Sequence, residues 1–364
     1  MSAKIHSDLV VTDMSTAYAE SAADEEYSEF SFATGQNQIT WSLGVMLWSW
    51  YVICELVISI TGIVGNVLVI AVVFGRRSKS RSTDILVGNL AIADFVTSIF
   101  LIPYPKLNSI PNSWTGAFFC KVVESDYLMW TTVTASIYSL VAVSLDRFFA
   151  VVYPIPFRRF VNRRLVNVIV CLIWAGSCVL MVRILLTNTT DVMVGKCVYQ
   201  PSPRNLEVIY GIYVFVVQFA LPTVLMLATQ VAIARSLRRQ AARFASNEST
   251  ASFHNIARSR VLTLTFTVIL IYVVCWAPDQ IAYFSFNLGI ISPSFVRSPV
   301  SRVTTALAIC NSCVNPILYT LRHPQFREAL KDFLRNKSKR NTPIFEDLEI
   351  SSRPEKSHES IEKA

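Results

Sequence analysis

The sequence predicts an all-α membrane protein: a seven-transmembrane helix bundle with a short amphipathic helix after the seventh span. Of the 364 residues, 52% are hydrophobic and only 16% are charged, whereas about a quarter of a soluble domain is charged. Seven apolar stretches reach the roughly 20 residues that a helix needs to cross a bilayer. This composition excludes a disordered chain and a collagen-like repeat, and 8 cysteines are too few for a small disulfide scaffold.

We expect the seven spans at about residues 46–74, 83–103, 121–150, 165–187, 206–234, 261–286 and 300–321. Several contain Gly or Pro, which bundled membrane helices tolerate because neighbouring helices satisfy the freed backbone groups. A β-barrel would show segments of ~10 residues with alternating polarity, and this chain has no such pattern. The predicted organisation is an acidic N-terminal tail (1–45), the bundle (46–321), an amphipathic juxtamembrane helix (322–335) and a C-terminal tail (336–364).

The loops predict the orientation of the bundle. Connections 75–82, 152–164 and 235–260 carry 14 Lys and Arg residues, whereas the N-terminal segment and the loops 104–119, 188–205 and 287–299 carry 5. Because loops rich in Lys and Arg stay cytoplasmic, we expect an extracellular N-terminus and a cytoplasmic C-terminus, with the chain in the plasma membrane. This topology accounts for the net charge of +8, so nucleic acid is not an expected partner.

Ionisable residues within the expected spans are costly and mark functional sites by default, and four of them stand out: Glu55, Asp94, Asp146 and Arg147. Asp94 either accepts a hydrogen bond from another helix, for example from Asn66 or Asn315, or binds a cation. Asp146 and Arg147 lie at the cytoplasmic end of the third span, where an interfacial ion pair is the alternative to a functional role. Glu55 fits no pattern, and a hydrogen bond inside the bundle is its simplest explanation.

Each expected helix also carries a short motif. In chain order these are Gly65-Asn66, Leu90-Ala91-Ile92-Ala93-Asp94, Asp146-Arg147-Phe148, Trp174, Pro222, Cys275-Trp276-Ala277-Pro278 and Asn315-Pro316-Ile317-Leu318-Tyr319. Any one of them is a weak signal. Together and in this order they resemble the class A, rhodopsin-like G-protein-coupled receptors, and the resemblance covers roughly residues 50–335.

The resemblance implies a receptor whose bundle has two arrangements, which an outer ligand shifts through its different affinity for each. Pro278 removes a backbone hydrogen bond, so the sixth helix can bend there. Asp146 would hold Arg147 at rest through a charge-assisted hydrogen bond, and outward movement of the sixth helix would present Arg147 to a heterotrimeric G protein. The residues assigned to this switch are Asp146, Arg147, Phe148, Ile137, Pro222, Tyr272, Trp276, Pro278, Asn315, Pro316 and Tyr319. Core packing is the alternative role for Trp276.

The resemblance also implies a sodium pocket, formed by Asp94, Ser136, Asn311, Ser312 and Asn315. A hard cation prefers such oxygen ligands, and sodium would act as an allosteric ligand of the resting state. No other cofactor is expected.

Two cysteines are expected on the outer side of the membrane: Cys120 at the top of the third helix and Cys197 in the second outer loop. Both face the oxidising side, so we expect a disulfide between them. Asn188-Thr189-Thr190 in the same loop is a glycosylation sequon, with Asn188 as the acceptor.

Several features depart from the family pattern. The distance from Cys120 to Arg147 is 27 residues, two more than usual, which predicts a bulge or a shifted start in the upper third helix. Gln230 stands at the position of the fifth-helix tyrosine, and Tyr272 replaces the usual Phe four residues before Trp276. These departures leave the switch in place, but we expect them to raise basal activity.

Two positions narrow the ligand class, because opsins and amine receptors of the family carry a particular residue at each. Ile309 stands where opsins carry the retinal lysine, which excludes light sensing. Met129 stands where amine receptors carry an aspartate; counting from Cys120 instead gives Tyr127, and Asp126 is one residue away, so an amine is disfavoured but not excluded.

Pro103 and Trp114 are typical of peptide receptors. A peptide with a basic residue is favoured by five acids expected around the cavity mouth: Glu124, Asp126, Asp191, Glu207 and Asp279. The alternative is that they merely solvate the outer loops. Candidate ligand-binding residues are Glu124, Asp126, Tyr127, Met129, Glu207, Trp276 and Asp279.

The alternatives to a peptide receptor are an amine or lipid receptor of the same fold and, from a different class, a secondary transporter. Transporters often show repeated halves, and the sequence contains none. An enzyme is disfavoured because the spans hold no metal cluster or nucleophile arrangement.

Further partners are the lipid bilayer, which a basic stripe at Arg235, Arg238, Arg239 and Arg243 would contact, and a receptor kinase with arrestin. Candidate phosphorylation sites are Ser246, Ser249, Thr250, Ser252, Ser351, Ser352, Ser357 and Ser360.

Overall fold

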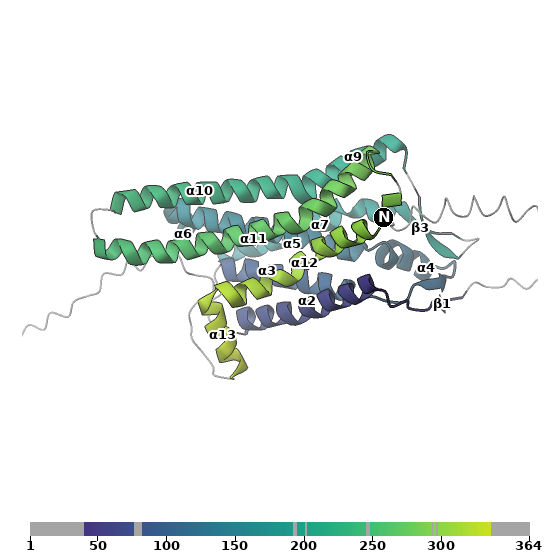
Figure 1. The fold of residues 1–364 in the computed structure, drawn as a ribbon, viewed down its shortest axis with the longest axis horizontal. Helices are drawn as coiled ribbons and strands as arrows, with labels where there is room; N and C mark the ends of the chain where they lie inside the picture. Colours follow the sequence, from purple (N-terminus) through teal and green to yellow (C-terminus); the bar gives the residue numbers. More distant parts are fainter. Residues whose placement is uncertain are drawn as a thin grey trace, which may run out of the picture.

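The computed structural model describes residues 40–75, 82–191, 195–200, 202–244, 248–292, 294–295 and 298–335. The elements are β1 (Ser42–Leu43), α2 (Trp50–Phe74), α3 (Ser82–Phe100), β2 (Leu107–Ser109), α4 (Trp114–Phe118), the π-helix η2 (Phe119–Glu124), α5 (Tyr127–Val152), α6 (Pro154–Phe160), α7 (Arg163–Leu180), α8 (Val182–Thr187), β3 (Asn188–Asp191), β4 (Lys196–Tyr199), α9 (Arg204–Phe215), the π-helix η3 (Val216–Ala220), α10 (Leu221–Phe244), α11 (Glu248–Leu288), α12 (Pro299–Arg322) and α13 (Pro324–Leu334). The long helices run side by side as a bundle (Figure 1).

Six helical stretches of the described chain are long and apolar enough to cross a membrane: Trp50–Phe74, Ser82–Phe100, Trp114–Val152, Arg163–Thr187, Arg204–Gln240 and Phe266–Leu288. The seventh member of the bundle, α12, has 24 residues but a less apolar sequence. Its polar residues Asn311, Ser312 and Asn315 are buried, so they face the other helices rather than lipid. The predicted seven-helix bundle is therefore confirmed, with the seventh helix held by its inner face.

The third and fifth membrane helices are each interrupted by a π-helical turn. In the third, η2 is followed by Asp126, which has a left-handed backbone conformation with φ of 59° and precedes α5. Asp adopts this conformation more readily than most residues. A π-helical turn accommodates extra residues within a helix. This irregularity confirms the expectation drawn from the two additional residues between Cys120 and Arg147.

Several helix ends differ from the expected spans. Helix α2 begins at Trp50 rather than residue 46, and α3 ends at Phe100 rather than residue 103. Helix α10 continues to Phe244 and α11 begins at Glu248, so both project beyond α2 and α3 at the end where α13 lies (Figure 1). The hydropathy of a span marks the part that lies in lipid, whereas a polar helix can continue into water.

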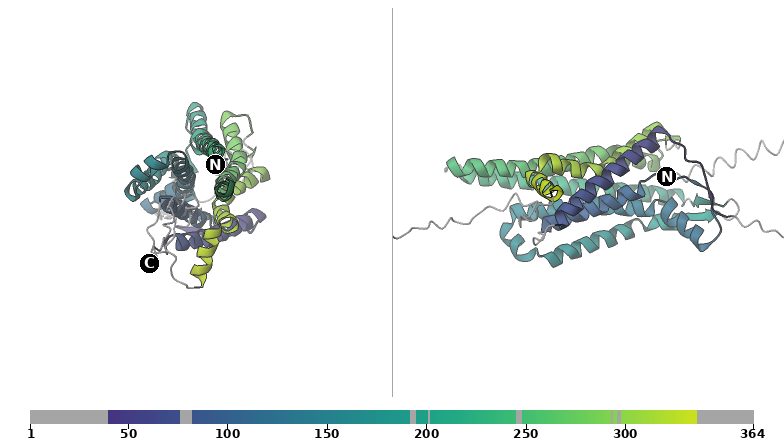
Figure 2. Two further views of the ribbon diagram at one scale, coloured as in Figure 1. Left: turned by 90° about the vertical axis from the view of Figure 1, so that its left-hand side faces the viewer. Right: turned by 90° about the horizontal axis from the view of Figure 1, so that it is seen from below.

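At the opposite end the chain forms two small two-stranded antiparallel sheets, of which β3–β4 is a hairpin and neither of which the sequence predicted. Strand β1 pairs with β2, and β3 pairs with β4 from Asn188–Tyr199 to Asp191–Lys196. Viewed along the bundle, the helices surround a common interior (Figure 2). The largest buried apolar cluster lies there and includes Leu140, Met226 and Ile269.

The amphipathic helix after the seventh span is α13, and it runs across the end of the bundle (Figure 1). Pro324 occupies its first turn, where a missing N–H costs no helical hydrogen bond. The Phe326 N–H bonds to His323 Nδ1 at 3.2 Å. Phe326 and Ala329 pack against Val69 and Tyr319, while the other face is exposed. The predicted 1–45 and 336–364 tails lie largely outside the described residues.

Candidate functional site

At the end of the bundle near α13, Asp146 joins α5 to α3. The Nη2 atom of Arg147 lies 3.2 Å from Asp146 Oδ2, and the Thr83 hydroxyl of α3 donates to the same oxygen at 2.5 Å. Asp146 is buried. A buried carboxylate needs such hydrogen-bond donors. The Asp146 carboxylate therefore holds the Arg147 guanidinium beside it. The ion pair expected between Asp146 and Arg147 is present.

Two further switch residues, Phe148 and Tyr319, pack against neighbouring elements. Phe148 lies beside Tyr153, with ring centroids 5.8 Å apart, and packs against the cluster of Val151, Ile233 and Leu237. Tyr319 of α12 is buried, with its ring 6.0 Å from that of Phe326. The third helix is thus packed against α10 on one side, and the end of α12 against α13 on the other.

In the middle of the bundle, Asp94 of α3 is fully buried and bonded from two helices. Ser136 of α5 donates to Oδ1 at 2.6 Å, and Asn315 Nδ2 of α12 donates to Oδ2 at 2.9 Å. Ser312 also interacts with this carboxylate, and Asn66 bonds to the Ser312 carbonyl at 3.0 Å. Four of the five expected sodium ligands therefore meet around one carboxylate, and Asn311 is buried on the same helix.

The aromatic part of the predicted switch lies in the main buried cluster. Ile137, Tyr272 and Trp276 belong to it, and the rings of Tyr272 and Trp276 are 6.5 Å apart. Pro278 lies inside α11, two residues beyond Trp276. The indole Nε1 of Trp276 is buried without a hydrogen-bond partner in the described part of the chain, so packing alone positions this ring.

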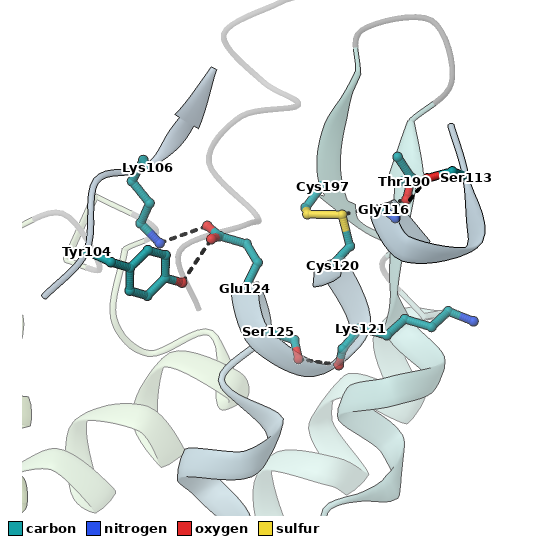
Figure 3. The surroundings of a disulfide bond; sticks show 10 residues. All are labelled: Tyr104, Lys106, Ser113, Gly116, Cys120, Lys121, Glu124, Ser125, Thr190 and Cys197. Carbon is teal, nitrogen blue, oxygen red and sulfur yellow. Dashed lines mark hydrogen bonds and ion pairs between the residues drawn. A yellow bond between two sulfur atoms is a disulfide. The ribbon is translucent and has the colours of Figure 1, made fainter. Parts of the chain in front are cut away.

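At the other end of the bundle, the expected disulfide joins Cys120 of η2 to Cys197 of β4 (Figure 3). Close by, Lys106 Nζ lies 2.8 Å from Glu124 Oε1, and the Tyr104 hydroxyl donates to Glu124 Oε2 at 3.1 Å (Figure 3). Burial, together with the Glu124 carboxylate, raises the pKa of Tyr104. Glu124, expected to contact ligand, is therefore bonded within the chain.

Glu207 of α9 is likewise bonded within the chain. Its Oε1 accepts from Arg183 Nη2 at 2.8 Å, the Tyr199 hydroxyl at 2.7 Å and the Ser202 N–H at 2.9 Å. The Arg183 guanidinium also lies 4.0 Å from the Tyr210 ring centroid. Burial and the Glu207 carboxylate raise the pKa of Tyr199 to about 12, so the phenol remains a donor at neutral pH. Two of the five expected ligand acids are thus bonded within the chain, and Glu207 joins α9 to β4 through Tyr199.

The remaining ligand candidates differ in their surroundings. The Tyr127 hydroxyl donates to the Cys178 carbonyl of α7 at 3.2 Å, which directs it away from α11 and α12. Met129 is buried with Leu101 and Ile309. Asp279 Oδ1 accepts from Thr305 of α12 at 2.9 Å.

Asp126 is the candidate acid whose carboxylate forms no hydrogen bond or salt bridge with the described residues, although the Lys106 ammonium attracts it and the Glu124 carboxylate repels it. Asp126 is exposed. Asp191 also lies at this end, in β3, and Asn188 of the sequon donates from Nδ2 to the Ile184 carbonyl at 2.8 Å.

Some residues of these networks were missed from the sequence. Arg183 lies inside an expected span, and a charge at that depth was a signal that it needs a buried partner. Asn89 was also missed: it accepts from Trp174 Nε1 at 2.9 Å and donates to Ser139 at 2.8 Å, which joins α3, α5 and α7. Gln218 and Tyr138, at the π-helical turn η3, carried no motif.

Comparison with known proteins gives one family match and several relatives. The family described as 7 transmembrane receptor (rhodopsin family) matches residues 65–319. The allatostatin-A receptor of Bombyx mori is 28% identical over 289 residues, which cover 75% of this chain and 76% of the relative. G-protein coupled receptor 15 of Mus musculus is 26% identical over the same shares of the two chains.

Proposed function

Because the chain belongs to the rhodopsin family of seven-transmembrane receptors, a family of signalling receptors rather than enzymes, we propose that it is activated by an extracellular peptide with a basic group. We further propose that the active receptor promotes nucleotide exchange on a heterotrimeric G protein. The movement responsible is an outward swing of the Glu248 end of α11. The observation that carries this proposal is the Arg147–Asp146 pair with its tie to Thr83.

The physical basis is a shift between two populations. A ligand that binds the open arrangement more tightly raises its share. Arg147 is paired with Asp146 near the end of α5, and α10 and α11 project beyond α2 and α3 at the end of the bundle where α13 lies (Figure 1). When α11 moves outward, the guanidinium becomes accessible between these helices and can donate to the G protein. Asn315, Pro316 and Tyr319 move with α12 beside it.

A peptide ligand is supported by two observations. The relative from Bombyx mori is named for allatostatin A. In this chain, the exposed Asp126 carboxylate forms no hydrogen bond or salt bridge with the described residues, although the Lys106 ammonium attracts it, and it lies next to the disulfide-linked turn. An ammonium or guanidinium group of a peptide would pair with it. Glu124 and Glu207 need no ligand because Lys106 and Arg183 already neutralise them.

We place the hairpin end outside the cell and the α13 end in the cytoplasm, with the receptor in the plasma membrane. The distribution of Lys and Arg supports this orientation. The Cys120–Cys197 disulfide supports it as well, because disulfides persist in oxidising compartments. Thr40, whose carbonyl accepts from Ser109, lies at the same end.

Sodium is proposed as an allosteric ligand at Asp94. The site fits a hard cation, because a buried carboxylate and the hydroxyls of Ser136 and Ser312 converge there and because the hydrogen-bond donors to this carboxylate in the described residues are neutral. Asp94, Ser136, Asn311, Ser312 and Asn315 would hold the ion. Its charge would stabilise the resting arrangement of α3, α5 and α12.

Arrestin and a receptor kinase are proposed as further partners. Ser246 and residues 351–360 lie outside the described part of the chain, and the side chains of Ser249, Thr250 and Ser252 lie outside it as well. An amine receptor is the nearest alternative, but Met129 lies in an apolar cluster at the position where an aspartate would be needed. The family match excludes the transporter alternative.

The proposed coupling is tested by replacing Arg147. In membranes with equal amounts of surface-delivered receptor, Arg147→Ala should lower nucleotide exchange on a panel of heterotrimeric G proteins at least tenfold. Arg163→Ala is the matched control, since it removes an exposed arginine at the same end of the bundle. Full exchange by Arg147→Ala would overturn the proposal.

The ligand class is tested with a peptide library and a second-messenger readout. We expect activation by peptides with a basic group, and Asp126→Asn should weaken their potency roughly tenfold, the value of one charge-assisted contact. Glu124→Gln is the control, because its carboxylate is already paired. Activation by neutral lipids alone would contradict a peptide ligand.

A further inference from the structure

The π-helical turn η3 leaves two backbone carbonyls without their ordinary donors. In an α-helix the carbonyl of residue i accepts from the N–H of residue i+4. The Leu221 N–H instead bonds to the Val216 carbonyl, which deprives Val217 of this donor. Pro222 has no N–H, which deprives Gln218 of its donor. Buried carbonyls of this kind must find partners elsewhere.

Two tyrosine hydroxyls supply these partners, and they come from different helices. Tyr138 of α5 donates to the Val217 carbonyl at 3.1 Å. Tyr272 of α11 donates to the Gln218 carbonyl at 2.6 Å. The Gln218 side chain adds a second tie to α5, from Nε2 to Thr134 Oγ1 at 2.9 Å. The turn is thus bonded to α5 twice and to α11 through the hydroxyl of Tyr272.

The two tyrosines differ in what happens to them when α11 bends. Tyr138 and η3 belong to helices that the bend at Pro278 does not involve. Tyr272 lies six residues before Pro278 in α11, on the side of the bend that continues to Glu248. Its side chain is fully buried. An outward swing of that part of α11 therefore draws the Tyr272 hydroxyl away from the Gln218 carbonyl.

We propose that the Tyr272 hydroxyl is a latch that holds α11 against η3 in the resting receptor. This inference rests on the proposed function, because it concerns the same movement of α11. When the latch opens, the Gln218 carbonyl loses the donor that compensates for Pro222, so the open arrangement becomes less favourable. Replacement of the family's usual Phe by Tyr272 therefore lowers basal activity, which is the reverse of the effect expected from the sequence.

The test compares Tyr272→Phe with Tyr138→Phe. Each substitution removes one hydroxyl that bonds to neighbouring carbonyls of the same turn, but only Tyr272 joins the turn to α11. The measurement is agonist-free nucleotide exchange per surface-delivered receptor, with the same G-protein panel. Tyr272→Phe should raise exchange roughly three- to tenfold, the equivalent of one net hydrogen bond. Tyr138→Phe should leave it within about twofold.

A second measurement does not require the G protein. The distance between spin labels at Leu165 of α7 and Phe266 of α11, both exposed, reports the open population directly. Tyr272→Phe should increase the share of long distances without ligand, and Tyr138→Phe should not.

Three outcomes overturn the latch. The first is an equal rise in both variants, which means that the integrity of the turn matters and not its tie to α11. The second is unchanged or lowered exchange per receptor in Tyr272→Phe together with unchanged distances. The third is reduced surface delivery alone, which indicates a purely structural hydroxyl. If Arg147→Ala still abolishes exchange, these outcomes leave the proposed function intact; if Arg147→Ala is fully active, it is the proposed function that fails.

Discussion

The two π-helical turns of this receptor have similar local geometry but different attachments. At η2, a covalent bond fixes Cys120 to Cys197 of the outer hairpin, and Glu124 pairs with Lys106. At η3, the carbonyls of Val217 and Gln218 are held by tyrosine hydroxyls. A disulfide persists in every arrangement of the helices, whereas one hydrogen bond contributes only about 1 kcal/mol net and can be exchanged. The attachment of η2 is therefore covalent and permanent, whereas the hydrogen bonds that attach η3 can break and re-form.

The same contrast extends along the molecule. The hairpin end combines the disulfide with the Arg183–Glu207 pair, which has a further three hydrogen bonds around it. At the other end, Arg147 is paired with its own neighbour in sequence, and Asp146 is tied to α3. Neither of these two contacts joins α5 to α11. In the proposed function, the ligand binds at the firmly joined hairpin end and changes the packing of α11 below it.

The largest expected effect comes from removing the Cys120–Cys197 disulfide. Cys120→Ser breaks a bond that closes a separation of 77 residues, and we expect a loss of about 2–4 kcal/mol in the free energy of unfolding. The measurement is thermal unfolding of the purified receptor in detergent, together with surface delivery. Cys178→Ser is the control, because Cys178 is free and exposed. Equal stability of the two variants would show that the disulfide does not stabilise the folded receptor.

The two outer ion pairs should differ in the same way. Glu207→Gln leaves the half-buried Arg183 without its carboxylate, and we expect a loss of about 1.5–3 kcal/mol. Glu124→Gln removes a pair whose Lys106 side chain is 69% exposed, so the loss should be no more than about 1 kcal/mol. Thermal unfolding of both variants gives the comparison. A greater loss for Glu124→Gln would reverse our view of which pair anchors the hairpin.

The smallest expected effect concerns the polar centre of the bundle. Sodium should weaken agonist binding severalfold, because the ion favours the resting arrangement, and Asp94→Asn should abolish that dependence. Competition binding in sodium chloride and in N-methylglucamine chloride at equal ionic strength provides the test. If the mutant keeps the sodium response of the wild type, the ion does not bind at Asp94.

The bundle could be predicted from the sequence because each apolar stretch signals a span on its own. The irregular third helix was predicted as well, since a motif at Arg147 and a cysteine at position 120 fix a spacing. The turn at η3 was not predicted, because Pro222 marks a missing donor but not the residue that replaces it.

The partners of the charged residues could not be predicted from the sequence either. Glu124 and Glu207 were expected to face a ligand, yet Lys106 and Arg183 neutralise them. A charge is visible in a sequence, but the partner that satisfies it depends on how distant segments pack. The short strands β3 and β4 were missed for a related reason: Asn188–Asp191 is polar throughout, and its pairing is set by the flanking disulfide and helices rather than by alternation.

The most direct test of the central claim is the distance between labels at Leu165 and Phe266, measured on a background without the exposed cysteines Cys54, Cys171 and Cys178. A second pair, at Leu206 of α9 and Leu288 of α11, both exposed, reports the outer end. Binding of nucleotide-free G protein should lengthen the first distance by several ångströms and leave the second almost unchanged. Nucleotide exchange with an unchanged Leu165–Phe266 distance would contradict the claim that α11 carries the signal.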